Sequence, residues 1–184
     1  MSNMSTTDGK VVVNRAMSLD GFIAGRDDAM DWVAEYLPPE TLREQAAATG
    51  AMLVGRRTAE VGARMEAEKP GRVDYPFSGP VFVLTHRPPE PPGPGTTYLT
   101  GDIGQVVATA RGAAGAKDLE ILGADVAGQC LRRGLVDELL VYVLPVLLGD
   151  GVRFLPPGLP RMDLEPISST RSGDVTILRF GVRS

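Results

Sequence analysis

Strand-like runs and helical segments alternate along most of this sequence, and this order constrains the fold more than any other feature. The apolar runs have the length of buried strands, and the segments between them place apolar residues at helical spacing. Strands are predicted at 10–17, 50–54, 80–84, 96–99, 118–122 and 135–144, with a closing pair at 162–170 and 175–182. Helices are predicted at 32–36, 40–48, 56–65, 103–112 and 126–133, and loops at 22–31, 66–79, 87–95 and 145–161.

This order predicts an α/β domain with a mostly parallel central sheet, helices on both of its faces and an antiparallel C-terminal edge. The length of 184 residues suits one domain with a substantial core. We expect residues 10–184 to form that domain and residues 1–9 to be a flexible N-terminus. Asp102 is expected to cap the helix that follows it.

One cysteine and one histidine exclude several kinds of chemistry. With only Cys130 and His86, the chain cannot build an internal disulfide or a zinc site rich in histidine or thiolate, so we expect no metal. The lone cysteine and the polar N-terminus favour a cytoplasmic protein. We expect no nucleic-acid partner because the formal net charge is −4, and no membrane partner because the sequence lacks a long apolar run.

The first candidate for phosphate binding is the turn after the run 50–54. Gly55 turns the chain and a helix follows, so the first backbone N–H groups of that helix have no intrahelical partners. Anions bind well at such a helix start. Arg56, Arg57 and Thr58 would add guanidinium and hydroxyl donors. The alternative is a simple turn with solvated arginines.

The same arrangement recurs after the run 118–122, where Gly123 and Ala124 precede a second helix. Glycine would let the backbone approach a ligand closely. Both turns follow the carboxyl ends of strands, which is the edge where open α/β sheets bind ligands. The chain lacks the usual Rossmann and P-loop fingerprints. These turns therefore indicate a phosphate-bearing cofactor without identifying it.

Two further segments carry candidate binding residues. Thr85, His86 and Arg87 follow a strand and cluster a hydroxyl, an imidazole and a guanidinium, which could bind a 2′-phosphate and so select NADPH over NADH. The alternative is a surface loop whose charges face water. Near the N-terminus, the turn at Asp20 is followed by the apolar pair 22–23, which could cover a flat ring.

Taken together, these motifs resemble one family. Their order resembles the reductase domain of bacterial bifunctional riboflavin-biosynthesis deaminase-reductases, which is similar in fold to dihydrofolate reductase. The resemblance covers about residues 10–182 and implies a dihydrofolate-reductase-like three-layer sandwich, NADPH binding, hydride transfer to a pyrimidine- or pteridine-like ring, and often a homodimer. The motifs are Ser18-Leu19-Asp20-Gly21-Phe22-Ile23-Ala24, Gly55-Arg56-x-Thr58, Leu84-Thr85-x-Arg87, Gly123-Ala124, Leu135-Val136-Asp137-Glu138-Leu139 and the run 145–151.

The resemblance also implies roles for individual residues. It places Asp20 and Trp32 on the substrate side. The implied cofactor residues are Gly55, Arg56 and Thr58 at the phosphates, Thr85, His86 and Arg87 at the adenosine end, Gly123, Ala124, Asp125, Val126 and Ala127 along the pyrophosphate, and Met17, Ser18 and Ala24 near the nicotinamide.

Two departures separate this chain from the riboflavin reductases. Their Glu-Gly-Gly run is missing around Gly123, and the deaminase half with its zinc ligands is absent from the sequence. The substrate is therefore left open within the class of small heterocycles.

The residue that supplies a proton for the reduction is also left open. Asp20 and Asp31 are equal candidates, with Glu35 behind them, because a carboxyl group beside Trp32 could be desolvated and hold a proton. The alternative for Asp31 is a helix N-cap. Rival functions are a non-catalytic nucleotide- or flavin-binding dimeric module of the same fold, or a dimeric interaction protein with a vestigial pocket.

Overall fold

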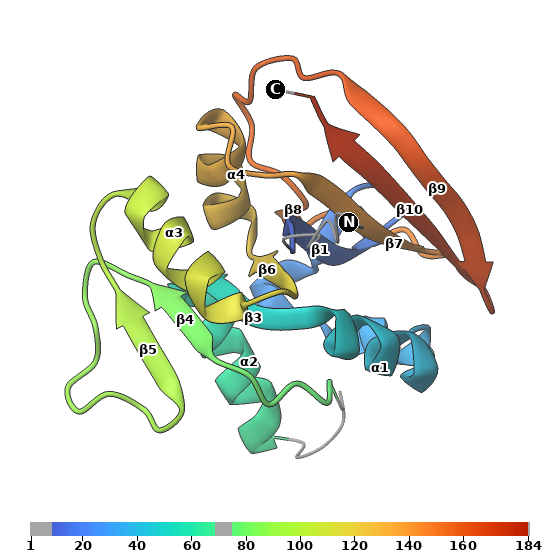
Figure 1. The fold of residues 1–184 in the computed structure, drawn as a ribbon. Helices are drawn as coiled ribbons and strands as arrows, with labels where there is room; N and C mark the ends of the chain where they lie inside the picture. Colours follow the sequence, from blue (N-terminus) through green and yellow to red (C-terminus); the bar gives the residue numbers. More distant parts are fainter. Residues whose placement is uncertain (1–8, 69–74, 184) are drawn as a thin grey trace.

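The computed structural model describes residues 9–68 and 75–183, and its main sheet has eight strands (Figure 1). The expected flexible N-terminus lies outside these residues except for Gly9, and so does the part 69–74 of the expected loop 66–79. The strand order is β5 (Thr96–Leu99), β4 (Val81–Leu84), β3 (Thr49–Gly55), β6 (Asp118–Leu122), β1 (Val11–Ser18), β7 (Glu138–Leu144), β10 (Val175–Val182) and β9 (Leu164–Ser172).

The pairing of the strands confirms the predicted sheet. Every pair from β5 to β7 is parallel, whereas β10 pairs antiparallel with both β7 and β9. Helices form the crossovers between the parallel strands, as is usual for parallel pairing, except between β4 and β5, where residues 85–95 contain no helix. The helices are α1 (Pro39–Ala48), α2 (Arg56–Glu68), α3 (Ile103–Ala114) and α4 (Ala124–Arg132), with short 3-10 turns at Arg26–Asp28 and Asp31–Glu35.

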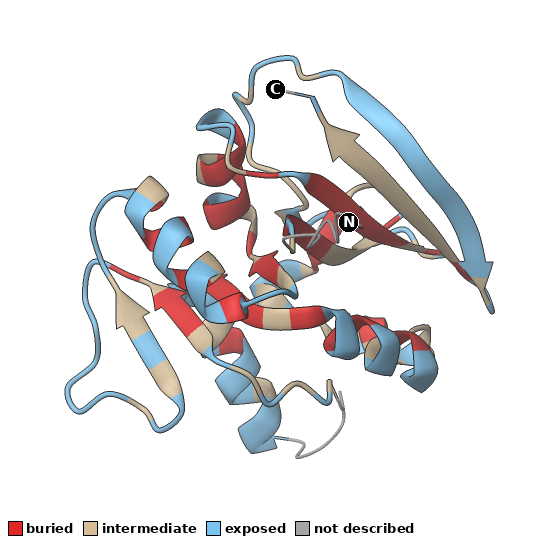
Figure 2. Ribbon diagram, viewed as in Figure 1, coloured by how far each residue is buried: buried red, intermediate tan, exposed pale blue. Residues whose placement is uncertain are grey.

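The helices cover the sheet from both sides and complete the predicted three-layer sandwich (Figure 1). The apolar faces of α3 and α4 pack against inward-facing residues such as Leu53, Leu119 and Ile121. The opposite face packs Val12, Leu140 and Tyr142 against the turn that contains Val33. Figure 2 shows that buried residues concentrate on the central strands and α4, while β9 is exposed along the outer edge.

Several element boundaries differ from the sequence-based expectations. Two short strands, β2 (Phe22–Ala24) and β8 (Val152–Arg153), pair within segments expected to be loops, because they satisfy each other's backbone groups across a long sequence separation. Helix α2 continues to Glu68, three residues beyond its expected end. Strand β7 begins only at Glu138 and β9 only at Leu164.

Helix starts were predicted with mixed success. The Asp102 side chain accepts hydrogen bonds from Gly104 N at 2.9 Å and Gln105 N at 3.3 Å, so the N-cap of α3 is confirmed. The N-cap alternative for Asp31 is wrong, because Met30 occupies that position and Asp31 lies in the first turn. No described helix is both long and apolar enough to cross a membrane.

Candidate active site

A cavity of about 550 Å³ opens where β3, β4 and β6 end, and we refer to it as the first cavity. The three strands are parallel neighbours, so the turns that follow them meet at one edge of the sheet. The wall contains every predicted cofactor residue except three. Its lining residues are Arg15, Ile23, Ala24, Asp28, Met30, Gly55, Arg56, Arg57, Thr58, Val61, Leu84, Thr85, His86, Arg87, Gly123, Ala124, Asp125, Val126, Gln129 and Val152.

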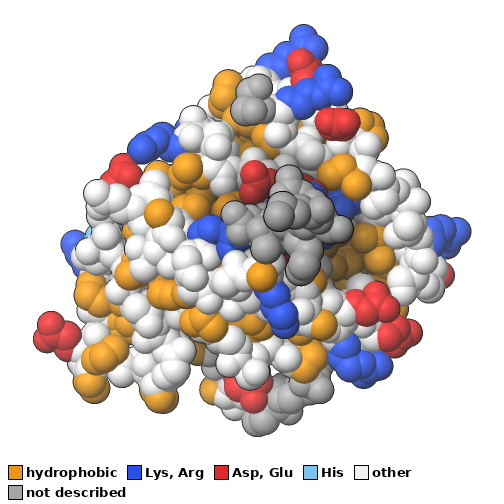
Figure 3. Space-filling model, viewed as in Figure 1, with side chains coloured by type: hydrophobic (Ala, Val, Ile, Leu, Met, Phe, Trp, Pro, Cys, Tyr) orange, Lys and Arg blue, Asp and Glu red, His pale blue; other side chains and the backbone are white. Residues whose placement is uncertain are grey.

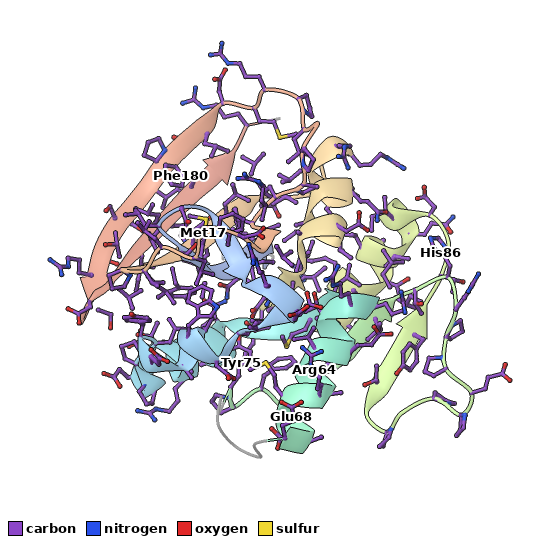
Figure 4. All side chains as sticks on the ribbon, turned by 180° about the vertical axis from the view of Figure 1, so that it is seen from behind. Met17, Arg64, Glu68, Tyr75, His86 and Phe180 are labelled. Carbon is purple, nitrogen blue, oxygen red and sulfur yellow. The ribbon has the colours of Figure 1, made fainter. Side chains whose placement is uncertain are left out.

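Met17, Ser18 and Ala127 are the predicted cofactor residues that lie outside the described wall. Ser18 is fully buried, and its hydroxyl accepts a hydrogen bond from Phe22 N at 3.0 Å. Ala127 lies on the buried face of α4 and packs into the core. Figure 4 shows Met17 well separated from His86, whereas Ala24, the third residue predicted near the nicotinamide, lines the same cavity as His86.

Two glycine turns form the inner wall of the first cavity. Gly123 has a φ of +110°, and a Cβ atom placed there would lie 2.8 Å from Thr58 Oγ1. Gly55 lies so close to Val126 that a Cβ atom placed on Gly55 would be 3.1 Å from Val126 Cγ2. Gly123 provides no side-chain cap to α4, so the N–H groups of the first turn remain available to a ligand. The two turns therefore pack tightly against Thr58 and Val126, which leaves little room for a Cβ atom at either glycine.

The arginines at the rim differ in what they contact. Arg56 pairs with Glu60 at 2.9 Å, and Arg57 pairs with Asp28 at 2.8 Å. Arg87 is exposed, and within the described chain its guanidinium forms no hydrogen bond or ion pair. Its backbone N–H donates to Thr85 Oγ1 at 3.1 Å, which fixes the turn. Arg87 is therefore the rim cation most available to an anionic ligand.

A second cavity of about 610 Å³ lies beside the first, between the sheet and the helices α1 and α2. Both cavities share Arg15, Met30 and Thr58 in their walls, so they adjoin. The apolar wall includes Val33, Leu37, Leu42, Met52 and Val54. This arrangement provides room for a second ligand next to a cofactor.

Of the predicted proton donors and substrate residues on the turn at 31–35, only one lines a described cavity wall. Asp31 is exposed and lines the second cavity. Trp32 is not among the described lining residues. It packs against the apolar cluster around Tyr142, and its indole N–H donates to the Ala29 carbonyl at 3.1 Å. Glu35 is exposed at the end of the same turn and also lies outside both described walls.

Sequence reasoning missed a buried polar group on the floor of the second cavity. Glu120 accepts hydrogen bonds from Tyr75 Oη at 2.6 Å, Thr49 Oγ1 at 2.9 Å and Asn14 Nδ2 at 3.1 Å. Burial raises the pKa of Glu120, and it also raises the pKa of Tyr75. The sequence did carry a signal for this buried polar group. Glu120 interrupts the apolar run of β6, and the polar pair 14–15 interrupts the apolar run of β1.

Asp20 holds two loops together. Its carboxylate accepts hydrogen bonds from Ser18 Oγ at 2.6 Å, Gly149 N at 2.7 Å and Leu148 N at 3.1 Å. The Ser18 hydrogen bond, with the two backbone N–H groups, lowers the pKa of Asp20. A carboxylate that stays ionised cannot deliver a proton at neutral pH. These contacts favour a loop-fixing role for Asp20 over a catalytic one.

Asp20→Asn is therefore expected to lower the melting temperature at neutral pH. Because the folded pKa lies below the unfolded value of 3.8, the stabilisation is present above that pH and is lost as pH falls through the folded pKa. The melting-temperature difference between wild type and Asp20→Asn should shrink in acid, as followed by circular dichroism. A difference independent of pH would contradict this role.

Neither a strongly charged patch on the face in Figure 3 nor a metal-binding group stands out among the described residues. On the face drawn in Figure 3, basic and acidic side chains are interspersed with hydrophobic ones. Among the residues that the structure describes, no group of three or more His, Cys, Asp or Glu side chains could hold a metal ion.

The fold is a dihydrofolate-reductase-like α/β sandwich. The dihydrofolate reductase of Enterococcus faecalis, complexed with NADP(H) and RAB-propyl, matches with a TM-score of 0.67 and 14% identity, covering 96% of this chain and 98% of that one. A Shewanella sp. PV-4 protein whose name refers to riboflavin biosynthesis matches with a TM-score of 0.79 and 24% identity, covering 95% of this chain and 99% of that one.

The model of the RibD C-terminal domain matches residues 9–178, so the chain belongs to the RibD C-terminal domain family, and the resemblance seen in the motif order is confirmed. The Thermotoga maritima diaminohydroxyphosphoribosylaminopyrimidine deaminase/5-amino-6-(5-phosphoribosylamino)uracil reductase matches with a TM-score of 0.65 and 14% identity over 96% of this chain, which spans only 57% of that protein. A comparison with curated proteins finds no match.

Proposed function

We propose that this protein is an NADPH-dependent oxidoreductase that transfers a hydride to a small pteridine- or pyrimidine-like heterocycle. The observation that carries the proposal is a pair of cavities that share three lining residues, the first at the carboxyl edge of the sheet and the second between the sheet and helices α1 and α2. Two ligands that exchange a hydride must lie in contact, and cavities of this size are typical of ligand sites. Family membership supports the same reaction class.

The residues of the first cavity fit a dinucleotide. Gly55 and Gly123 allow the backbone to approach a pyrophosphate, and the start of α4 offers N–H donors. Arg87 lies at the rim without a competing carboxylate among the described residues, as a receptor for a 2′-phosphate should. When bound, NADPH would supply the hydride. The side chains of the protein would orient both ligands and supply the proton.

Of the carboxyl groups predicted as proton donors, Asp31 is the one that lines the second cavity, so we assign it to the acceptor. Reduction of a C=N or C=O group builds negative charge, which a proton must neutralise. Asp31→Asn is expected to slow steady-state NADPH oxidation by about 10²–10⁴-fold while leaving NADPH affinity unchanged. Glu35→Gln, on the same turn but outside the cavity wall, serves as the control and should change neither quantity. Unchanged turnover in Asp31→Asn would remove Asp31 from the mechanism.

The activity is tested by following loss of reduced nicotinamide absorbance with a panel of pterins, pyrimidines and quinone-like acceptors. Oxidation that depends on one acceptor class is the expected result. NADPH binding without oxidation by any of them would instead favour the non-catalytic nucleotide- or flavin-binding dimeric module. Absence of NADPH binding would contradict both readings.

We also propose a homodimer in the cytoplasm. Strand β9 is the outer edge of the sheet and is exposed almost throughout, with Leu164 at 37% and Ile167 at 50% exposure. Unpaired edge strands with apolar side chains favour association. Light scattering after size exclusion should therefore give twice the chain mass of 19.5 kDa. An Ile167→Lys variant should shift that mass toward the monomer, and a monomeric wild type would contradict the proposal.

A further inference from the structure

A carboxylate of the protein itself contacts one of the cations of the first cavity. Asp28 and Arg57 both line this cavity, which also contains the turns at Gly55 and Gly123. Asp28 Oδ1 lies 2.8 Å from Arg57 Nη2, and Asp28 Oδ2 accepts a hydrogen bond from Arg57 Nε at 3.0 Å. A guanidinium binds phosphate oxygens with the same pair of donors. A phosphate and the Asp28 carboxylate therefore cannot occupy this side of Arg57 together.

The two partners of this ion pair differ in exposure. The Arg57 side chain is 70% exposed, whereas that of Asp28 is 17% exposed. An ion pair with an exposed partner contributes little to stability, because water and salt screen the attraction. An anion with more charge than a carboxylate can therefore displace Asp28 from Arg57 at little cost to the fold.

The backbone around Asp28 is left-handed and is held by contacts with α2. Asp27 and Asp28 have φ values of 56° and 60°. Residues other than glycine rarely adopt this region, and two in succession persist where the surroundings hold them. The Arg64 guanidinium donates to the Asp27 carbonyl at 3.2 Å, from two turns further along α2 than Arg57. Two arginines on one face of α2 thus hold this segment in place.

The same segment, 25–30, ends at the wall between the two cavities. Met30 lines both cavities. The Trp32 indole N–H donates to the Ala29 carbonyl at 3.1 Å, and Trp32 is the only tryptophan in the chain. A shift of the segment would therefore alter the shared wall and also the surroundings of this one tryptophan.

We propose that Asp28 is a built-in competitor for the cofactor. Its carboxylate and the diphosphate of the nucleotide compete for Arg57, so nucleotide binding displaces Asp28 and loosens the segment 25–30 from α2. The nucleotide in this inference rests on the proposed function, whereas the competition itself requires only an anion. The competition weakens NADPH and NADH alike, because both carry the diphosphate, and it couples cofactor binding to the wall beside the acceptor.

Isothermal titration calorimetry of wild type and Asp28→Asn tests the competition, with NADPH, NADH and inorganic pyrophosphate as ligands. Asparagine tolerates the left-handed backbone and removes the charge. Asp28→Asn should bind all three ligands about three- to tenfold more tightly than wild type. A residue that held the cofactor would show a loss instead of this gain. If Asp28→Asn does not fold, Asp28→Gly takes its place, because glycine adopts this backbone freely.

Glu60→Gln is the matched control for the change in charge. Glu60 pairs with Arg56 at 2.9 Å on the same helix, and it is not among the described lining residues of the first cavity. This variant should change the three affinities by less than about twofold. Arg57→Met should weaken all three ligands. Asp28→Asn added to Arg57→Met should then give a gain of less than about twofold, because the cation for which Asp28 competes is gone.

Trp32 fluorescence reports the movement of the segment. Inorganic pyrophosphate is the ligand for this measurement, because it does not absorb the light that tryptophan emits, as reduced nicotinamide does. Pyrophosphate should change the emission of wild type in proportion to its binding. Asp28→Asn should show the changed emission before any ligand is added, and pyrophosphate should change it little further.

Three outcomes would overturn the proposal. Asp28→Asn could bind none of the ligands more tightly than wild type, Glu60→Gln could give the same gain, or Trp32 emission could be the same in wild type and Asp28→Asn and stay constant on binding. Failure of the proposed function gives a different result. Neither nicotinamide nucleotide would then bind, yet pyrophosphate would still bind more tightly to Asp28→Asn than to wild type.

Discussion

Gly123→Ala is expected to weaken NADPH binding by about a hundredfold while the protein still folds. The added Cβ atom would lie 2.8 Å from Thr58 Oγ1, so either Thr58 or the glycine turn must shift. The backbone at Gly123 also has a φ of +110°, where a side chain adds strain of about 1–3 kcal/mol. Displaced backbone N–H groups can no longer meet a pyrophosphate at hydrogen-bond distance. Calorimetric titration with NADPH measures the effect.

Gly112→Ala is the matched control for this substitution. Gly112 lies within α3, and a Cβ atom there would meet no atom within 4 Å. Alanine in a helix is favoured over glycine by about 0.5–1 kcal/mol, so this variant should be slightly more stable and bind NADPH normally. If Gly123→Ala bound NADPH as tightly as Gly112→Ala does, the phosphate would not lie at the Gly123 turn.

Arg87→Ala is expected to weaken NADPH by about ten- to a hundredfold and to leave NADH affinity nearly unchanged. Arg87 lines the first cavity from the turn after β4, and its guanidinium has no hydrogen bond or ion pair within the described chain. A 2′-phosphate would gain charge-assisted hydrogen bonds there, whereas NADH offers only a hydroxyl group. Fluorescence titration of both nucleotides measures the ratio.

Arg56→Ala separates this effect from a general loss of positive charge. Arg56 lines the same cavity but already pairs with Glu60 at 2.9 Å, so its loss should affect NADPH and NADH to a similar and smaller extent. Equal losses of NADPH and NADH affinity in Arg87→Ala would contradict the assignment of Arg87 to the 2′-phosphate.

Local sequence patterns predicted the parts of this fold that depend on local chemistry. The strand-glycine-helix turns at Gly55 and Gly123 were readable because each combines a buried run, a small residue and a helix start. Their meeting at one cavity followed from the parallel sheet, since the carboxyl ends of parallel strands share an edge. Most of the predicted cofactor residues therefore line the same cavity, although their role in binding a cofactor stays a prediction.

The features that sequence could not predict depend on long-range pairing. Strands β2 and β8 are too short to show a period, and only their mutual hydrogen bonds define them. The carboxylate of Asp20 accepts hydrogen bonds from the N–H groups at 148 and 149, a contact across the sequence that favours a loop-fixing role over the predicted proton donation. The second cavity combines β1, α1, α2 and β6, and no local pattern encodes that meeting.

Titration of the wild-type protein with NADPH tests the central claim most directly. The two glycine turns and the rim arginine predict saturable binding of one NADPH per chain well below millimolar cofactor, and weaker binding of NADH. Absence of saturation at millimolar NADPH would contradict the account of the first cavity as a cofactor site.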